Sequence, residues 1–176
     1  MAALQGRIAL VTGASKGIGA GIARALADAG AAVAVNYAGS RTDAERVVSE
    51  IAGIGGRAVA IQADVSKRAD VERLFTETIA ALGAPDIIVN NAGVFSFQPL
   101  EEVVEAEFHR QFDVNVLGTI LVAQEAVKHF PASGGSIINI SSTASANPEA
   151  NSVIYSAGKA AVDTISRALA QELGPR

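Results

Sequence analysis

Two side chains near the end of the chain, Tyr155 and Lys159, have the types and the spacing for proton transfer. Residues four apart lie on the same face of a helix, so these side chains are neighbours if the segment is helical. A free phenol has a pKa near ~10 and is a poor base at pH 7, but a nearby ammonium group favours the phenolate and lowers that pKa. Such a tyrosine can exchange a proton with a substrate oxygen near neutral pH. Because Tyr and Lys occur at this spacing often by chance, the pair alone is weak support for a catalytic site.

Other chemically apt residues follow short apolar runs. Ser142 stands 13 residues before Tyr155, just after the run 136–140. Asn90-Asn91-Ala92-Gly93 ends another run, where small residues leave room for a ribose, although taken by itself this segment is better explained as an ordinary strand-end turn. Ligands of open α/β sheets bind outside the carboxyl ends of the strands, so these segments are candidates for one shared site.

A glycine-rich turn follows the first apolar run. Residues 12–19 read Thr-Gly-Ala-Ser-Lys-Gly-Ile-Gly, which is T-G-x-x-x-G-x-G rather than G-x-G-x-x-G. Glycines there let the backbone approach a pyrophosphate, and the following helix offers free N–H groups and the positive end of its dipole. The alternative is a tight turn that binds no ligand. The turn follows the first strand of a chain in which strands and helices alternate, and this position makes the alternative less favoured.

The elements that must position these residues alternate between short apolar runs and longer helical patterns. Strands are predicted at 7–12, 32–35, 58–61, 86–90 and 136–140, and helices at 18–29, 42–54, 71–82, 105–130 and 153–173. This repetition implies parallel strands, right-handed crossovers and helices on both faces. We therefore expect an α/β fold, a doubly wound parallel sheet of Rossmann type, in a single domain over residues 1–176.

Composition excludes several classes of function. The net charge of −4 argues against nucleic acid as the main partner. The absence of cysteine rules out disulfides and thiolate metal sites, and two isolated histidines make no metal cluster, so no metal is expected. No run approaches the roughly 18 apolar residues of a membrane span, and the apolar run near the N-terminus is too short for a signal peptide, so a cytoplasmic setting is expected.

Taken together, the motifs resemble those of the short-chain dehydrogenase/reductase family, in its single-domain form. The matching features occur in order and with suitable spacings: the Thr12–Gly19 string, Asn90–Gly93, Asn115, Ser142 and Tyr155-x-x-x-Lys159. The resemblance implies a catalytic set of Asn115, Ser142, Tyr155 and Lys159. Tyr155 would be the acid in reduction and the base in oxidation, Ser142 would hydrogen-bond the carbonyl oxygen, Lys159 would also hold the nicotinamide ribose, and Asn115 would anchor a water that feeds protons to Lys159.

The resemblance also implies a set of cofactor-binding residues: Gly13, Ser15, Lys16, Gly17, Ile18, Gly19, Asn36, Ser40, Arg41, Asp64, Val65, Asn91, Ala92 and Gly93, together with Tyr155 and Lys159. An acidic residue at the end of the second strand would hold the 2′-hydroxyl of NAD, but that place reads Val35-Asn36-Tyr37. The cations Lys16 and Arg41 suit a 2′-phosphate. We therefore expect NADP(H) to be preferred over NAD(H), the alternative being that both cations are solvated surface charges.

The expected activity is interconversion of a ketone and a secondary alcohol. The family members most similar in character are 3-oxoacyl-carrier-protein reductases and sugar or polyol dehydrogenases, which the chain does not separate. A different class, a nucleotide-binding module without catalysis, stays open, whereas no motif favours a scaffold. Apolar residues lie on more than one face of 105–130 and 153–173, and these helices pair between subunits in the family, so a homo-oligomer, commonly a tetramer, is expected.

Family members normally continue beyond the Tyr-Lys helix with further strands and a loop that covers the substrate, whereas this chain stops at Arg176. The fifth strand is therefore expected to form an exposed edge of the sheet. The 176-residue chain by itself is expected to have little activity, because the groups that fix the nicotinamide ring and exclude water lie outside it.

Overall fold

Runs of buried, mostly aliphatic residues form one parallel sheet, with the strand order β3-β2-β1-β4-β5. The computed structural model describes residues 3–174. The strands are β1 (Ile8–Val11), β2 (Ala32–Tyr37), β3 (Ala58–Gln62), β4 (Ile87–Asn90) and β5 (Ser136–Asn139). The chain runs from β1 through β2 to β3 on one side of the sheet, and then continues with β4 and β5 on the other side of β1. The switch point, where open α/β sheets bind ligands, therefore lies between β1 and β4. The expected doubly wound sheet of five parallel strands is confirmed.

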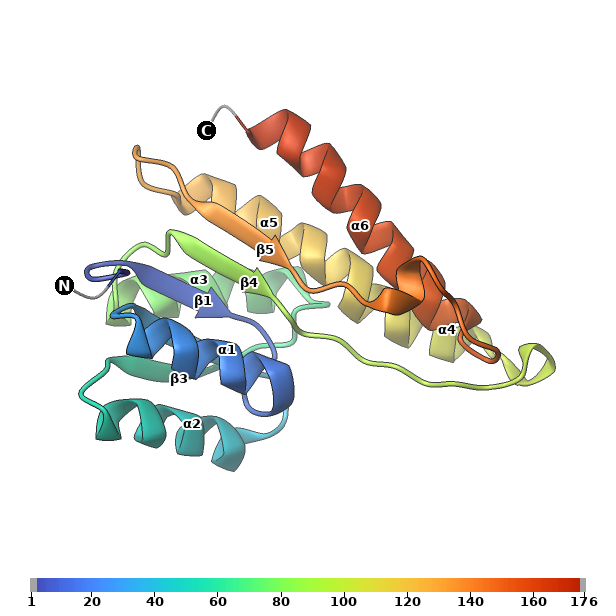
Figure 1. Cartoon of the computed structure of the whole chain (residues 1–176), viewed down its shortest axis with the longest axis horizontal. Helices are drawn as coiled ribbons and strands as arrows, with labels where there is room; N and C mark the ends of the chain where they lie inside the picture. The colour runs from blue at the N-terminus through green and yellow to red at the C-terminus, as the bar shows by residue number, and fades with distance from the viewer. Residues whose placement is uncertain (1–2, 175–176) are drawn as a thin grey trace.

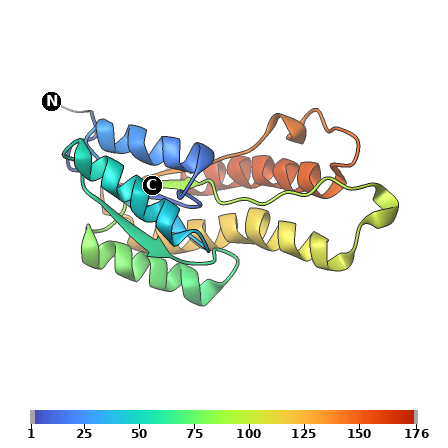
Figure 2. The ribbon, with the colours of Figure 1, turned by 90° about the horizontal axis from the view of Figure 1, so that it is seen from below.

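Helices cover both faces of the sheet (Figures 1 and 2). They are α1 (Gly17–Asp28), α2 (Arg41–Gly53), α3 (Arg68–Ala81), α4 (Glu105–Phe112), α5 (Gly118–His129) and α6 (Val153–Leu173). Alternate residues of a strand point to opposite faces. Accordingly, Ala9 and Val11 belong to the core formed with α1 and α2, whereas Leu10 belongs to the core formed with α3 and α5.

The segment 105–130 differs from the single helix expected there. A π-helical turn, η2 (Asp113–Leu117), separates α4 from α5, and the N–H of Gly118 bonds to the carbonyl of Asp113, five residues back. Such turns insert one residue into a helix and are frequent at functional sites. The buried Asn115 lies inside the turn. The other helices and strands begin and end within three residues of the expected positions, a difference usual for element ends.

The fifth strand lies at an edge of the sheet. Within residues 3–174, β5 pairs with β4 alone, and Ile138 is 47% exposed. A hollow of about 800 Å³ lies beside it, lined by residues of α5, β5 and α6 and of the turn between α5 and β5. The expected exposed edge is therefore present. None of the helices formed by the described residues is long and apolar enough to span a membrane.

Candidate active site

The glycine turn, Asn91 and Ser142 all lie at the carboxyl edge of the sheet. The turn connects β1 to α1, Asn91 follows β4, and Ser142 follows β5 (Figure 1). Because β1, β4 and β5 are neighbours in the sheet, their carboxyl ends are adjacent. The fold thus brings three segments that are distant in sequence to one rim.

Two glycines of the turn have backbone conformations that other residues rarely adopt. Gly13 has φ +61° and Gly17 has φ +57°. A Cβ on Gly13 would lie 2.8 Å from the Cα of Ala92, so this position also needs glycine for close packing. Nothing lies within 4 Å of a Cβ built on Gly17. The N-terminus of α1 therefore borders open space, and its first turn contains no acidic residue that would repel an anion.

The turn is fastened to the segment after β4 by Thr12 and Asn91. The Thr12 hydroxyl oxygen accepts hydrogen bonds from the N–H groups of Asn91 and Ala92, each at 3.0 Å. The Asn91 amide donates in return to the carbonyls of Thr12 at 2.9 Å and Gly13 at 3.1 Å. In this structure the Asn91 side chain supports the glycine turn. Thr12, the first residue of the Thr12–Gly19 string but not one of the expected cofactor-binding residues, is part of the same support.

Asn36 supports the turn from the other side. Its Oδ1 accepts the N–H of Gly13 at 3.1 Å, and its Nδ2 donates to the carbonyls of Ile61 at 3.3 Å and Ala63 at 3.1 Å. With Asn36 only 1% exposed, its side chain holds β2, β3 and the turn together. Its contribution to the site is the shape of the turn.

The cations expected near a 2′-phosphate are exposed. Lys16 precedes α1 and is exposed, and Ser40 precedes α2 and is partly buried. Arg41 forms an ion pair with Glu45 at 2.8 Å, which raises the pKa of the guanidinium. Arg41 is therefore firmly cationic, but a phosphate would have to share it with Glu45.

Asp64 and Val65 form the turn between β3 and α3. The Asp64 carboxylate accepts from the Ser66 N–H at 3.0 Å and from the Ser66 hydroxyl at 2.7 Å. Val65 is buried, and a Cβ on Gly118 would lie 2.8 Å from a Val65 methyl group. These contacts fix the position of the β3–α3 turn.

Lys159 and Asn115, two of the four expected catalytic residues, lie together beside Gly93. Lys159 is 7% exposed and its Nζ donates to the carbonyl of Ile140 at 2.7 Å. A Cβ on Gly93 would lie 3.3 Å from Asn115 Oδ1 and 3.8 Å from Lys159 Nζ. Gly93 therefore lies against Asn115 and Lys159, and a larger residue would crowd both.

Asn115 binds the backbone of the segment after β4. Its Oδ1 accepts the N–H of Val94 and its Nδ2 donates to the carbonyl of Val94, both at 2.8 Å. The carbonyl of Asn115 accepts the hydroxyl of Thr119 at 2.9 Å. Both polar atoms of the side chain are thus engaged in holding residue 94 against the π-helical turn.

Tyr155 and Ser142 line a common hollow of about 260 Å³, together with Phe95, Phe97, Thr143, Ala144, Glu149 and Ser152. Ser142 precedes a short 3₁₀ helix, η3 (Thr143–Ser145), and its hydroxyl accepts the N–H of Ala144 at 3.2 Å. The Nζ of Lys159 lies 5.9 Å from the centre of the Tyr155 ring. The phenol of Tyr155 and the hydroxyl of Ser142 therefore border space that a carbonyl group could enter, and the Lys159 ammonium lies behind the Tyr155 ring.

The charge of Lys159 is influenced by burial and by Asp163. Burial lowers the pKa of the Lys159 ammonium, and the Asp163 carboxylate opposes this change. The hydroxyls of Ser141 and Ser145 hold the pKa of Asp163 below its ordinary value, so Asp163 stays anionic. The sequence interpretation missed Asp163, although its place one helical turn after Lys159 was a usable signal.

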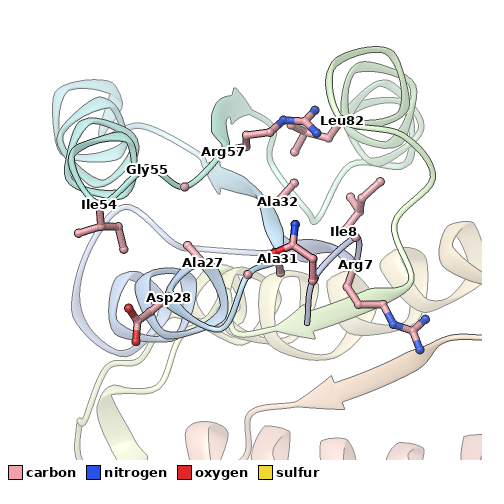
Figure 3. A pocket seen from close by; sticks show the side chains of 14 residues that line it. Arg7, Ile8, Ala27, Asp28, Ala31, Ala32, Ile54, Gly55, Arg57 and Leu82 are labelled. Atoms are coloured by element: carbon pink, nitrogen blue, oxygen red, sulfur yellow. The ribbon is translucent and has the colours of Figure 1, made fainter. Parts of the chain in front are cut away.

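A third hollow, of about 410 Å³, lies at the amino-terminal edge of the sheet (Figure 3). Arg7 and Arg57 line it, but Arg7 is paired with Asp86 at 2.7 Å. None of the expected site residues lines this hollow. Among the described residues, no group of three or more His, Cys, Asp or Glu side chains could hold a metal ion.

Comparison with known proteins gives consistent results. A model of the family described as short chain dehydrogenase matches residues 7–176. An uncharacterized oxidoreductase of Methylorubrum extorquens is 51% identical over the whole chain, which spans 71% of that protein. A hydroxynaphthalene reductase-like protein of Metarhizium majus is 45% identical over 98% of the chain and 65% of its own length. A short chain dehydrogenase from Burkholderia cenocepacia, solved in complex with NADP, superposes with a TM-score of 0.94 at 40% identity, covering 99% of this chain and 71% of the other.

Proposed function

The chain belongs to the short chain dehydrogenase family, and on that premise we propose an NADP(H)-dependent oxidoreductase that interconverts a ketone and a secondary alcohol. The observation that carries the proposal is the hollow that Tyr155 and Ser142 share at the carboxyl rim of the sheet, with the Lys159 Nζ 5.9 Å from the centre of the Tyr155 ring. The chain spans about two thirds of the length of its relatives, so the proposal concerns the activity of the intact protein.

Each catalytic side chain has a role that its surroundings support. In reduction, the Tyr155 hydroxyl gives its proton to the carbonyl oxygen of the substrate, and the Ser142 hydroxyl donates a hydrogen bond to the same oxygen. The Lys159 ammonium, close to the Tyr155 ring, stabilises the phenolate that remains. Asn115 keeps the segment after β4 in place beside Lys159. In oxidation, the Tyr155 phenolate takes the proton back.

The rim fits a nicotinamide dinucleotide, which when bound supplies or accepts the hydride. The positive-φ glycines and the N-terminus of α1 form a cradle for its pyrophosphate. Lys16 and Arg41 would bind the 2′-phosphate of NADP, and no carboxylate occupies the end of β2. The Burkholderia neighbour, solved with NADP, supports the same preference.

The substrate is a ketone whose class the family leaves open. A 3-oxoacyl thioester is the first candidate, and a sugar or polyol is the second. The name of the Metarhizium relative, a hydroxynaphthalene reductase-like protein, suggests a third candidate, a ketone that belongs to a fused aromatic ring system. All three would present a carbonyl or alcohol oxygen to Tyr155 and Ser142.

We also propose that the intact protein is a homo-oligomer, a tetramer being the expected form. Large apolar side chains are exposed on and beside α4, η2 and α6: Val104, Phe108, Leu117 and Val153. Burying such residues against a second subunit would remove their apolar surface from water.

The test is NADPH oxidation by the intact protein with a panel of ketones, for Tyr155→Phe beside the unmodified protein. The substitution removes the transferable proton and keeps the ring, so turnover should fall by at least about 100-fold. Binding of NADPH, measured by fluorescence titration, should change little. Thr76→Val is the control, because it removes an exposed hydroxyl group on α3 at a position that is not among the expected site residues.

Near-normal turnover by Tyr155→Phe would refute the catalytic assignment. If the unmodified protein bound NADPH but reduced no ketone, the nucleotide-binding module without catalysis would be the better interpretation.

A further inference from the structure

Two phenylalanine side chains stand exposed beside the Tyr155 ring. Phe95 is 65% exposed and Phe97 is 53% exposed. Their ring centres lie 6.0 Å and 5.9 Å from that of Tyr155, both in edge-to-face arrangements, and 5.7 Å from each other. Exposed large apolar groups that adjoin a polar site are typical of ligand-binding surfaces.

Both rings line the hollow that contains the Ser142 and Tyr155 side chains. A ligand that fills this hollow therefore contacts the phenyl rings as well as the Ser142 and Tyr155 side chains. Among the lining residues, Glu149 alone is charged, and its charge is negative. The hollow thus offers aromatic surface and hydroxyl groups to a ligand, but no cation for a phosphate or carboxylate.

The segment that carries the two rings is held firmly. Arg110 donates to the carbonyl of Phe95 at 3.2 Å, and Gln111 donates to the carbonyl of Ser96 at 3.4 Å. Arg110 is itself held by two hydrogen bonds to Glu107, at 2.7 and 2.8 Å.

The ends of the segment are also fixed. Asn115 binds both main-chain groups of Val94, and the N–H of Gln98 donates to the carbonyl of Asn151 at 2.9 Å. These bonds fix the main chain on both sides of Phe95 and Phe97, so the segment is ordered before a ligand arrives, which lowers the entropy cost of binding.

We propose that Phe95 and Phe97 are specificity-determining residues that select uncharged, planar aromatic ketones, such as those with two fused rings, over acyl thioesters and sugars. This inference rests on the proposed function, because it concerns the substrate of the same site. A planar ring system can contact the two phenyl rings face-on or edge-on, as aromatic pairs prefer. A sugar offers no aromatic face, and neither does an aliphatic acyl thioester, so neither gains these contacts.

The test compares alpha-tetralone, a fused-ring aromatic ketone, with diacetyl, a small aliphatic one, as substrates of the intact protein. Phe97→Ala and Phe95→Ala should each lower kcat/KM for alpha-tetralone by roughly tenfold, mainly through KM, since an aromatic contact and its buried area are lost. Activity on diacetyl should change by less than about threefold. Phe97→Leu, which keeps apolar bulk without a flat face, should recover only part of the loss. Ile54→Ala removes an exposed apolar side chain at the opposite edge of the sheet and serves as the control.

A second readout avoids turnover. Calorimetric titration of the NADP⁺-loaded protein with alpha-tetralone, a pair in which neither partner can give a hydride to the other, should show a roughly tenfold weaker affinity in the alanine variants. Equal losses on both ketones, full recovery in Phe97→Leu, or unchanged alpha-tetralone binding would each overturn the inference. Absence of activity on every ketone in the unmodified protein, with alpha-tetralone still bound through the phenylalanines, would instead count against the proposed function.

Discussion

Replacing Asn115 by alanine should destabilise the protein, because this side chain satisfies both main-chain groups of Val94. The hydrogen bonds to the N–H and the carbonyl are each 2.8 Å long. Since Asn115 is only 2% exposed, water cannot take over these bonds without entering the protein.

The size of the effect follows from the two groups left without partners. A buried donor or acceptor that loses its partner costs about 1–3 kcal/mol. Val94 is only partly buried, so the lower half of the range applies, giving a loss of about 2–4 kcal/mol in the free energy of unfolding. At about 2–4 °C per kcal/mol for a domain of this size, the Tm should fall by roughly 4–16 °C.

The assay is thermal unfolding followed by circular dichroism on the intact protein without cofactor, so that altered cofactor binding cannot contribute to the Tm. Gln171→Ala, an exposed position on α6, is the control and should melt within about 1 °C of the parent. If Asn115→Ala also melted within about 1 °C of the parent, the bonds to Val94 would not stabilise the fold and the reasoning would be wrong.

Three further predictions concern the cofactor, pH and assembly. Lys16→Ala or Arg41→Ala should weaken NADPH binding by roughly tenfold, and should weaken NADH binding far less, in a fluorescence titration. Equal affinity of the unmodified protein for both cofactors would contradict the NADP(H) preference. Asp163→Asn removes the carboxylate that opposes the burial of Lys159, so the Lys159 pKa should fall further and the ammonium form be lost at a lower pH. The alkaline limb of the kcat/KM profile should then move to lower pH, and an unchanged profile would exclude this role. Light scattering at micromolar concentration should show an oligomer that Phe108→Glu weakens, whereas a monomeric parent protein would refute the assembly.

Much of the fold could be predicted because local patterns and the tertiary structure agree. The apolar runs that form β1 and β4 are too short for helices and are buried on both faces, as parallel strands are. The spacing of Tyr155 and Lys159 places them on one helix, and α6 has the expected bounds. The parallel order of the strands then brings the glycine turn, Asn91 and Ser142 to one rim.

The parts that could not be predicted depend on long-range contacts. The residues next to Asn36 in the sequence do not indicate whether its side-chain amide is exposed or buried. The amide is buried against Gly13 and Ala63, and both partners are distant in sequence. The exposure of Phe95 and Phe97 could not be predicted from the sequence pattern either. Apolar residues in a loop usually pack inward, whereas these two face a hollow. Periodicity also gave one helix for 105–130, since a single π-helical turn barely alters the apolar spacing on either side.

The π-helical turn has a consequence for how this helix can vary in length. A π turn contains one residue more than an α turn, so deletion of a single residue within Asp113–Leu117 could be absorbed by forming regular α-helix through α4 and α5. α4 and α5 would keep their relative positions, because the wide turn is what accommodates the extra residue. Asn115, which lies inside the turn, would lose its place and with it the two hydrogen bonds to Val94. Variants of the gene that lack one codon here should therefore still give a folded helix, yet lose the side-chain support of the segment that precedes Phe95 and Phe97.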